Sequence, residues 1–189
     1  MELVARLCSA NPHKLAELRR SLPGWSIELL EASDYPPEDG STHYENARGK
    51  AVYGRAVGDP EAWMIGEDSG LQVDALGGGP GLHSARWAGD EDPIERLLRE
   101  LDGVDERAGR YVCELVALAP DGTERRGTGR LEGRIARERR GSEGFGYDPV
   151  FLPAGEELTV AELGNAWKVE NSHRARAARA LAASIEAPA

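Results

Sequence analysis

Residues 62–70 read AWMIGEDSG, an apolar run that ends in two adjacent acids. The run follows the turn-like segment Gly58-Asp59-Pro60, which predicts a short buried strand. The acids of Glu67-Asp68-Ser69-Gly70 are therefore expected where the strand enters a loop, the place where ligands collect in open α/β sheets. Neighbouring strand residues point to opposite faces, so Glu67 and Asp68 are not expected to hold one ion together. A metal on one of them needs a second carboxylate from elsewhere, and for these four residues alone an ordinary acidic turn is favoured.

Composition limits the class of protein. The chain has 189 residues, which suits a single domain over residues 1–189, with two lobes. Its net charge of -10 argues against general binding to nucleic acid or to anionic membranes. Cys8 and Cys113 lack zinc-site spacing and fit a reducing compartment. We find no signal-peptide pattern and no apolar run long enough for a membrane helix, so we expect a cytoplasmic protein.

The rest of the pattern alternates strands with helices. Further strands are predicted over residues 2–8, 25–30 and 150–152. Helices are predicted over residues 13–22, 42–57, 93–101 and from residue 171 or 172 onward. The second of these helices is expected to begin with a capping box at residues 42–45 and to end at about residue 57. Residues 110–119 and 123–133 flank Pro120-Asp121-Gly122, a strong hairpin signal. The sequence thus predicts an α/β fold whose central twisted sheet is mixed and flanked by helices.

The first strand and helix are joined by the segment Ser9-Ala10-Asn11-Pro12-His13-Lys14. Asn11 is expected as the N-cap and Pro12 as the first helical residue. Free backbone N–H groups there, with a hydroxyl, an amide and a lysine, suit a phosphate, although such caps are also common without a ligand.

Two later segments carry candidate ligand groups. Asn171-Ser172-His173-Arg174 puts two potential cations in the first turn of the last helix, with Lys168 just upstream, and a bound anion would offset the unfavourable helix dipole. Gly144-Phe145-Gly146-Tyr147-Asp148 suits stacking on a flat ring with a carboxylate near its edge. The alternatives are a solvated helix start and a loop that Phe145 and Tyr147 anchor in the core.

In this order, the segments strongly resemble the inosine triphosphate pyrophosphatase family, the XTP/dITP diphosphatases, over nearly the whole chain. Ser9-Ala10-Asn11 with Lys14 resembles the family's Thr-Gly-Asn-x-x-Lys, and the segment from Glu38 to Ala51 resembles its Glu-x-Gly-x-Thr-x-x-Glu-Asn-Ala pattern. The most specific matches are Gly79-Pro80-Gly81 with Ser84-Ala85-Arg86, Gly144 to Phe151, and Lys168 with Ser172-His173-Arg174. The departures are Glu67 for the usual Asp, Ala10 for Gly, His43 for Phe, and Trp167-Lys168-Val169 for Glu-Lys-Asn.

The resemblance implies hydrolysis of a nucleoside triphosphate between its α and β phosphates, in a cleft between two lobes. It implies that Glu38 and Asp68 hold Mg²⁺, and that Asp68 also orients or deprotonates the attacking water, with Glu67 sharing that task. Lys14, Lys50 and the loop 9–14 would neutralise the phosphates, and Ser69 would donate a hydrogen bond to them. It also implies a homodimer.

For the base, the resemblance implies that Phe145 in the loop with Gly146 and Tyr147 stacks the purine. Lys168, Asp148, His173 and Arg174 would recognise its edge. Hypoxanthine and xanthine carry a 6-keto acceptor where adenine has an amino donor, so donors aimed at position 6 would reject ATP. Two alternatives remain: a pyrophosphatase for modified pyrimidine nucleotides, which the aromatic loop disfavours, and a non-catalytic nucleotide sensor, which the presence of Glu38 and Asp68 disfavours.

Overall fold

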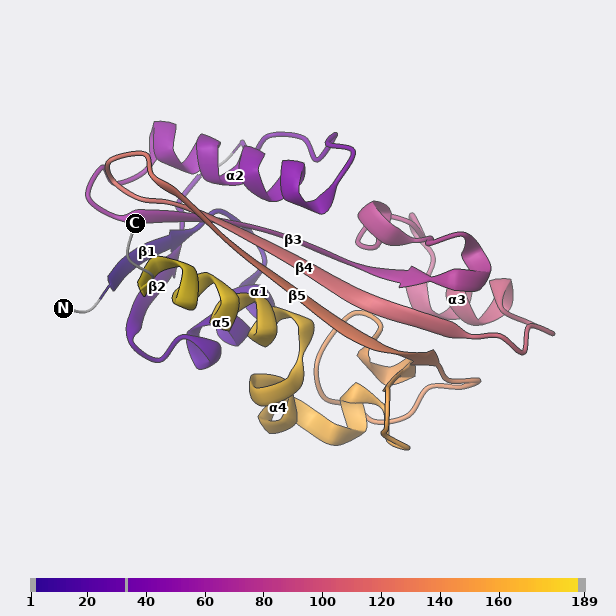
Figure 1. The fold of residues 1–189 in the computed structure, drawn as a ribbon. Coiled ribbons are helices and arrows are strands. Elements are labelled where there is room, and N and C mark those ends of the chain that lie inside the picture. The colour runs from indigo at the N-terminus through magenta and orange to yellow at the C-terminus, as the bar shows by residue number, and fades with distance from the viewer. Residues whose placement is uncertain (1–2, 33, 187–189) are drawn as a thin grey trace. The chain divides into compact units, whose positions relative to one another are not determined.

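The computed structural model describes residues 3–32 and 34–186, and shows a mixed α/β fold (Figure 1). Its strands are β1 (Leu3–Leu7), β2 (Trp25–Leu29), β3 (Trp63–Val73), β4 (Ala108–Leu118), β5 (Glu124–Ile135) and β6 (Phe151–Pro153). Its α-helices are α1 (Pro12–Ser21), α2 (His43–Val57), α3 (Pro93–Glu100), α4 (Val160–Asn171) and α5 (His173–Glu186). Three short 3₁₀ turns are η1 (Asp74–Leu76), η2 (Gly81–His83) and η3 (Asp148–Val150).

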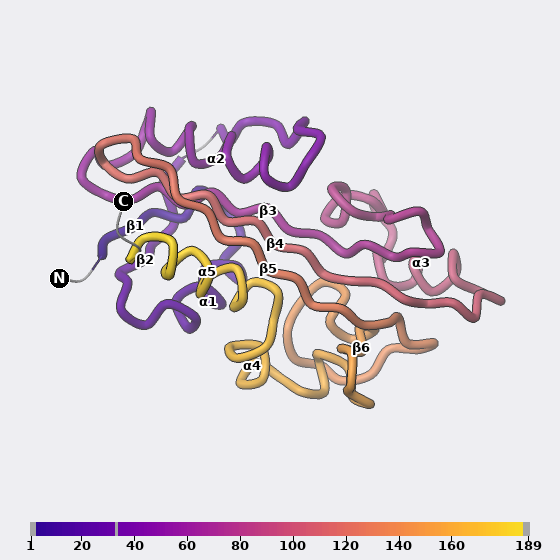
Figure 2. The backbone as a smooth tube through the Cα atoms, in the orientation of Figure 1, coloured from indigo at the N-terminus to yellow at the C-terminus, as the bar shows by residue number. Residues whose placement is uncertain are grey.

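The strands form a sheet in the order β2-β1-β3-β4-β5-β6. Strand β1 pairs in parallel with both β2 and β3, whereas β5 pairs antiparallel with β6. The predicted mixed sheet is therefore confirmed, and the tube in Figure 2 shows the tight turn that joins β4 to β5. The predicted strand over 2–8 is β1, and residue 2 lies outside the described residues, as does Ser33.

Contacts divide the chain into two units. The first comprises the described parts of 1–68, 113–129 and 173–189, and the second comprises 69–112 and 130–172. Strands β3, β4 and β5 each pass from one unit into the other.

Helices cover both faces of the sheet in the first unit (Figure 1). Helices α1 and α5 pack against each other and share a core that includes Leu18, Ile65, Leu115 and Leu181. On the other face, α2 packs through Ala47 and Ala51 against β4 side chains. A Cβ at Gly66 would overlap the Ala47 carbonyl, so glycine allows α2 to lie directly on β3.

The second unit has its own core, built on the far ends of β3, β4 and β5. Buried side chains from α3 and β6 pack there with those of the sheet, and the Tyr111 and Phe151 rings lie 4.5 Å apart between centroids. Asp92 caps α3 by accepting from the backbone N–H groups of Ile94 and Glu95. No helix among the described residues is long and apolar enough to cross a bilayer.

The structure corrects the predicted end of the strand before Glu67. Strand β3 runs without interruption through residues 67–70 to Val73, so these residues form the middle of a long strand and not an acidic turn. The physical reason is that both acids are buried and obtain polar partners from helices, which removes the need for a solvated loop.

The structure also adds a helix, α4, and alters the predicted start of another, α2. Helix α4 was not predicted, although Thr159 and Glu162 form a complete capping box at its start, because Gly164 at φ 83° interrupts the helical pattern. At α2, Thr42 accepts from the Glu45 N–H, but the Glu45 carboxylate accepts from Ser41, so the expected box is only half formed.

Candidate active site

Strand β3 places Glu67 and Asp68 on opposite faces within the first unit. Glu67 is fully buried and Asp68 is 4% exposed. Glu67 pairs with Lys14 on α1 and Arg174 on α5, whereas the partners of Asp68 come from α2. The alternation of a regular strand therefore gives the two acids separate environments.

One face of α2 surrounds Asp68. His43, Asn46 and Lys50 are spaced three and four residues apart and so lie on the same helix face. His43 Nδ1 lies 2.6 Å from Asp68 Oδ2, and Asn46 Nδ2 lies 3.4 Å from the same oxygen. Lys50 Nζ lies 3.4 Å from the other oxygen, Oδ1. The carboxylate is thus fixed by three donors from one helix.

The Lys50 ammonium joins the two carboxylates that were predicted to hold a metal. Its Nζ pairs with Glu38 as well as with Asp68, and it donates to the Glu67 carbonyl at 3.0 Å. Burial alone would lower the pKa of Lys50, but the charges of Glu67 and Asp68 outweigh burial and raise it. Glu38 and Asp68, 30 residues apart in sequence, therefore converge on one cationic group.

This donor set fits Mg²⁺. Magnesium is usually bound by one or two carboxylates, with waters and substrate phosphates completing its octahedron. Among residues 3–32 and 34–186, no cluster of three or more His, Cys, Asp or Glu residues suits a metal. The protein part of such a site would thus be Glu38 and Asp68, and a cation there would compete with the Lys50 ammonium.

Glu67 belongs to a buried ion network. Arg174 donates to its Oε1 from Nε at 3.2 Å and from Nη2 at 2.9 Å, and Cys113 Sγ donates to the same oxygen at 3.5 Å. Arg174 also pairs with Glu17. Burial would raise the pKa of Glu67, but the charges of Lys14, Arg174 and Lys50 hold it well below its usual value. Glu67 is therefore a carboxylate in the native protein.

The loop from Ser9 to Lys14 is folded as a helix cap. Asn11 Oδ1 accepts from the His13 and Lys14 N–H groups at 2.9 and 3.4 Å, which confirms the predicted N-cap. Ser9 Oγ accepts from the Asn11 N–H at 3.1 Å. Ala10, Pro12 and His13 are exposed, while Lys14 turns inward to Glu67. The phosphate-binding role of this loop, like that of Ser69 next to Asp68 on β3, stays a prediction.

In the second unit, Asp148 is the centre of a buried polar cluster. Its Oδ2 accepts from Lys168 Nζ at 2.6 Å and from the Phe145 N–H at 2.9 Å, and its Oδ1 accepts from the Tyr111 hydroxyl at 3.3 Å. Lys168 Nζ lies 4.8 Å from the centroid of the half-buried Phe145 ring. An aromatic face, a cation and a carboxylate thus lie together in this cluster.

The neighbouring residues of this loop have structural roles. Tyr147 is buried and its hydroxyl donates to the Ser84 carbonyl at 3.0 Å, and burial raises the pKa of Tyr147 to about 12. Tyr147 therefore anchors the loop, in agreement with the alternative interpretation. Gly144 has φ 82°, and a Cβ there would overlap the Asp148 carboxylate. Gly146 has φ 61° and open space at its Cβ position.

The predicted set for the purine edge is divided between the units. Lys168 and Asp148 are together in the second unit, whereas His173 and Arg174 begin α5 in the first. Arg174 is 2% exposed and is held by Glu17 and Glu67. His173 is also buried. Contact of these two side chains with a base stays a prediction.

Sequence reasoning missed several residues of the site. Asn46 and the donor role of His43 follow from helical spacing to Lys50, and Glu17 stands three residues after Lys14 on α1. Another signal was lysine usage. Only three of the 23 basic residues are lysines, Lys14, Lys50 and Lys168, and each has a largely buried side chain that pairs with an acid. Lysine is seldom buried unless it is paired.

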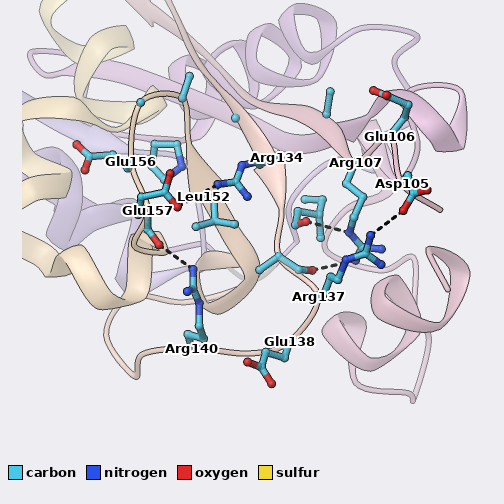
Figure 3. Close-up of a pocket in the computed structure, with 17 residues that line it drawn as sticks. Asp105, Glu106, Arg107, Arg134, Arg137, Glu138, Arg140, Leu152, Glu156 and Glu157 are labelled. Carbon is cyan, nitrogen blue, oxygen red and sulfur yellow. Dashed lines mark hydrogen bonds and ion pairs between the residues drawn. The ribbon is translucent and has the colours of Figure 1, made fainter. Parts of the chain in front are cut away.

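A large open pocket of about 830 Å³ lies elsewhere in the second unit (Figure 3). None of the predicted site residues lines it. Its arginines already have partners: Arg107 donates to three backbone carbonyls, Arg137 pairs with Asp105, and Arg134 pairs with Glu157. With five acids also in its lining, the pocket does not match the chemistry of a nucleotide site, and we assign it no function.

Comparisons with known proteins assign the chain to a family. The model of the Ham1 family matches residues 5–184. The chain belongs to the Ham1 family. It is 40% identical to a dITP/XTP pyrophosphatase of Bdellovibrio bacteriovorus, over 95% of this chain and 96% of the relative. It is 45% identical to one of Methylococcus capsulatus, over 96% and 95%.

Solved structures support the same family. The Ham1 protein of Staphylococcus aureus superposes with a TM-score of 0.83 at 34% identity, covering 97% of this chain and 98% of that protein. A HAM1 protein from Coxiella burnetii gives a TM-score of 0.82 at 33% identity, with the same coverage. The resemblance to inosine triphosphate pyrophosphatases and the predicted fold class are confirmed.

Proposed function

We propose that this chain hydrolyses non-standard purine nucleoside triphosphates, namely dITP, ITP and XTP, to the monophosphate and pyrophosphate. The relatives named dITP/XTP pyrophosphatase and the family match support the activity. The observation that carries the proposal is the convergence of Glu38 and Asp68 on one cationic position. A nucleotide sensor has no need for two carboxylates at that position.

Glu38 and Asp68 would hold a divalent metal, which we take to be Mg²⁺. Bound there, the ion would polarise phosphate oxygens and favour attack by water. Asp68 is the candidate base because it is more deeply buried than Glu38 and because three donors on α2 orient it. Glu67, held as a carboxylate by Lys14 and Arg174, would act through the position of Lys14 and of the strand.

Lys14 and Lys50 would bind the triphosphate. Both ammonium groups pair with carboxylates, Lys14 with Glu67 and Lys50 with Glu38. Their carboxylate partners hold them in fixed positions, so little side-chain entropy is lost when phosphate oxygens arrive. The N–H groups at the start of α1, together with Ser69, would contribute further hydrogen bonds.

The cluster in the second unit would recognise the base. The Phe145 ring offers a stacking surface, and Lys168 is a donor suited to a 6-keto oxygen. Asp148 holds Lys168 in place through a 2.6 Å contact. An adenine amino group would leave the Lys168 donor without an acceptor, so ATP is expected to be a poor substrate. A homodimer in the cytoplasm stays a prediction.

The proposal is tested by assaying ITP hydrolysis with Mg²⁺ in the wild type and in Asp68→Asn and Glu38→Gln. Asp68→Asn should reduce kcat about 10²- to 10⁴-fold, the range for loss of a general base. Glu38→Gln should raise the Mg²⁺ concentration needed for half-maximal rate. Glu28→Gln, in an exposed pair with Arg6, is the matched control and should leave both unchanged. Near-normal turnover by Asp68→Asn would contradict the assignment.

A further inference from the structure

His43 is a buried histidine in direct contact with Asp68. It is the first residue of α2 and is 7% exposed. Its Nδ1 lies 2.6 Å from Asp68 Oδ2, the shortest of the three contacts that α2 makes with this carboxylate. Because a carboxylate oxygen accepts hydrogen bonds, Nδ1 carries the hydrogen and donates a hydrogen bond to Oδ2. The ring orientation is therefore set by Asp68, and the Asp68 orientation by the ring.

The two oxygens of Asp68 have different surroundings. Oδ2 faces His43 and, at 3.4 Å, Asn46 Nδ2. Oδ1 faces Lys50, whose ammonium also pairs with Glu38. The oxygen on the side of the cationic position is thus Oδ1, and Oδ2 is occupied by a ring donor. A carboxylate that is fixed at one oxygen cannot rotate freely to exchange the two.

The two ring nitrogens of His43 differ in their contacts. Nε2 is buried and has no hydrogen-bond partner among the described residues. A buried polar atom without a partner destabilises the native state, and an apolar aromatic ring of similar size would avoid that cost. Packing therefore does not explain a histidine at this place, whereas donation from Nδ1 to Asp68 does.

We propose that His43 is a positioning residue for the metal site: its Nδ1–H fixes Asp68 so that Oδ1 alone is presented to the cation shared with Glu38. The inference rests on the proposed function, since it assigns His43 to the metal carboxylate of that reaction. Removing a group that hydrogen-bonds to a metal ligand and orients it typically lowers metal affinity or activity 10- to 100-fold.

The test uses three substitutions that separate the ring nitrogens. Asn places its amide donor close to the position of Nδ1, Gln places its donor near Nε2, and Phe keeps the ring but has no donor. Mn²⁺ affinity is measured on the substrate-free protein by electron paramagnetic resonance of the free ion. Thermal unfolding shows that each variant is folded, and kcat and KM for ITP are measured at saturating Mg²⁺.

We expect His43→Phe and His43→Gln to weaken Mn²⁺ binding about 10- to 100-fold. His43→Asn should stay within about threefold of the wild type by the same reasoning, and KM for ITP at saturating metal should be unchanged in all three. Equal Mn²⁺ affinity in His43→Phe and the wild type would overturn the inference, as would equal loss in the Asn and Gln variants. If the wild type binds Mn²⁺ but releases no pyrophosphate from ITP, the proposed function fails while the positioning result stands.

Discussion

Arg174 and Glu67, 107 residues apart in sequence, form an ion pair in which both side chains are buried, with Nη2 and Oε1 2.9 Å apart. Burial would lower the pKa of Arg174, but the charges of Glu67 and Glu17 raise it, so the pair stays ionised. The pair connects the start of α5 to the middle of β3 in the first unit. It thereby fixes the backbone next to Asp68.

Replacing Arg174 should lower the free energy of unfolding. Arg174→Met leaves Glu17 and Glu67 buried with less compensating charge, and breaking such a pair costs about 3–5 kcal/mol. The measurement is the free energy of unfolding in urea. Arg176→Met, an exposed position two residues later on the same helix, should change it by less than about 0.5 kcal/mol. Equal effects would show that the buried network contributes little.

The glycines around Phe145 give a matched pair of substitutions. Gly144→Ala and Gly146→Ala both place a side chain at positive φ, but only the first puts a Cβ into the Asp148 carboxylate. Both should lose roughly 1–2 kcal/mol from backbone strain. Gly144→Ala should in addition raise KM for ITP by displacing Asp148 and Lys168, measured by steady-state kinetics. If KM rises equally in both, strain alone accounts for the effect.

Lys168 should contribute to the choice of base. Lys168→Met removes a donor held by Asp148, and a hydrogen bond to a charged group is worth about 1.5–3 kcal/mol, or roughly 10- to 100-fold. We expect kcat/KM for ITP to fall by that factor. The ratio of ITP turnover to ATP turnover should fall as well. Glu170→Gln, exposed on the same helix, is the control. An unchanged ratio would remove Lys168 from base recognition.

Tyr147 predicts a pH dependence of stability. Its pKa in the folded protein, about 12, lies above the usual tyrosine pKa of about 10, so its contribution is complete below pH 10 and is lost as pH rises toward 12. Between pH 9 and 11 the wild type should lose about 1 kcal/mol more unfolding free energy than Tyr147→Phe. Urea unfolding of both proteins at the two pH values measures this. Parallel losses would contradict the burial of the hydroxyl.

Local signals predicted most of the fold. The helix starts at Asn11-Pro12 and Asp92-Pro93 and the hairpin around Pro120-Asp121-Gly122 depend on backbone chemistry within a few residues, and they appear as expected. The continuation of β3 through Ser69-Gly70 could not be predicted in this way. Whether those turn-prone residues stay extended depends on tertiary contacts, such as the hydrogen bond that the Ser84 hydroxyl accepts from the Leu71 N–H.

Only the parts of the site that depend on local sequence could be predicted. Asn11 acts through neighbours in sequence, and its cap was predicted from them, whereas Asp148 in the 144–148 loop also contacts Lys168 and Tyr111, which are distant in sequence. The partners of Arg174 are 157 and 107 residues away, so its placement with Glu17 and Glu67 required tertiary structure. The convergence of Glu38 and Asp68 came only from the family resemblance, because nothing local relates a loop acid to a strand acid.

In the proposed reaction, the phosphoanhydride bond between the α and β phosphates breaks. Purified protein with Mg²⁺ and ITP, analysed for phosphate with and without added inorganic pyrophosphatase, tests it most directly. The account predicts IMP and pyrophosphate, with orthophosphate appearing only when the coupling enzyme is present. Orthophosphate and IDP as the first products would contradict it.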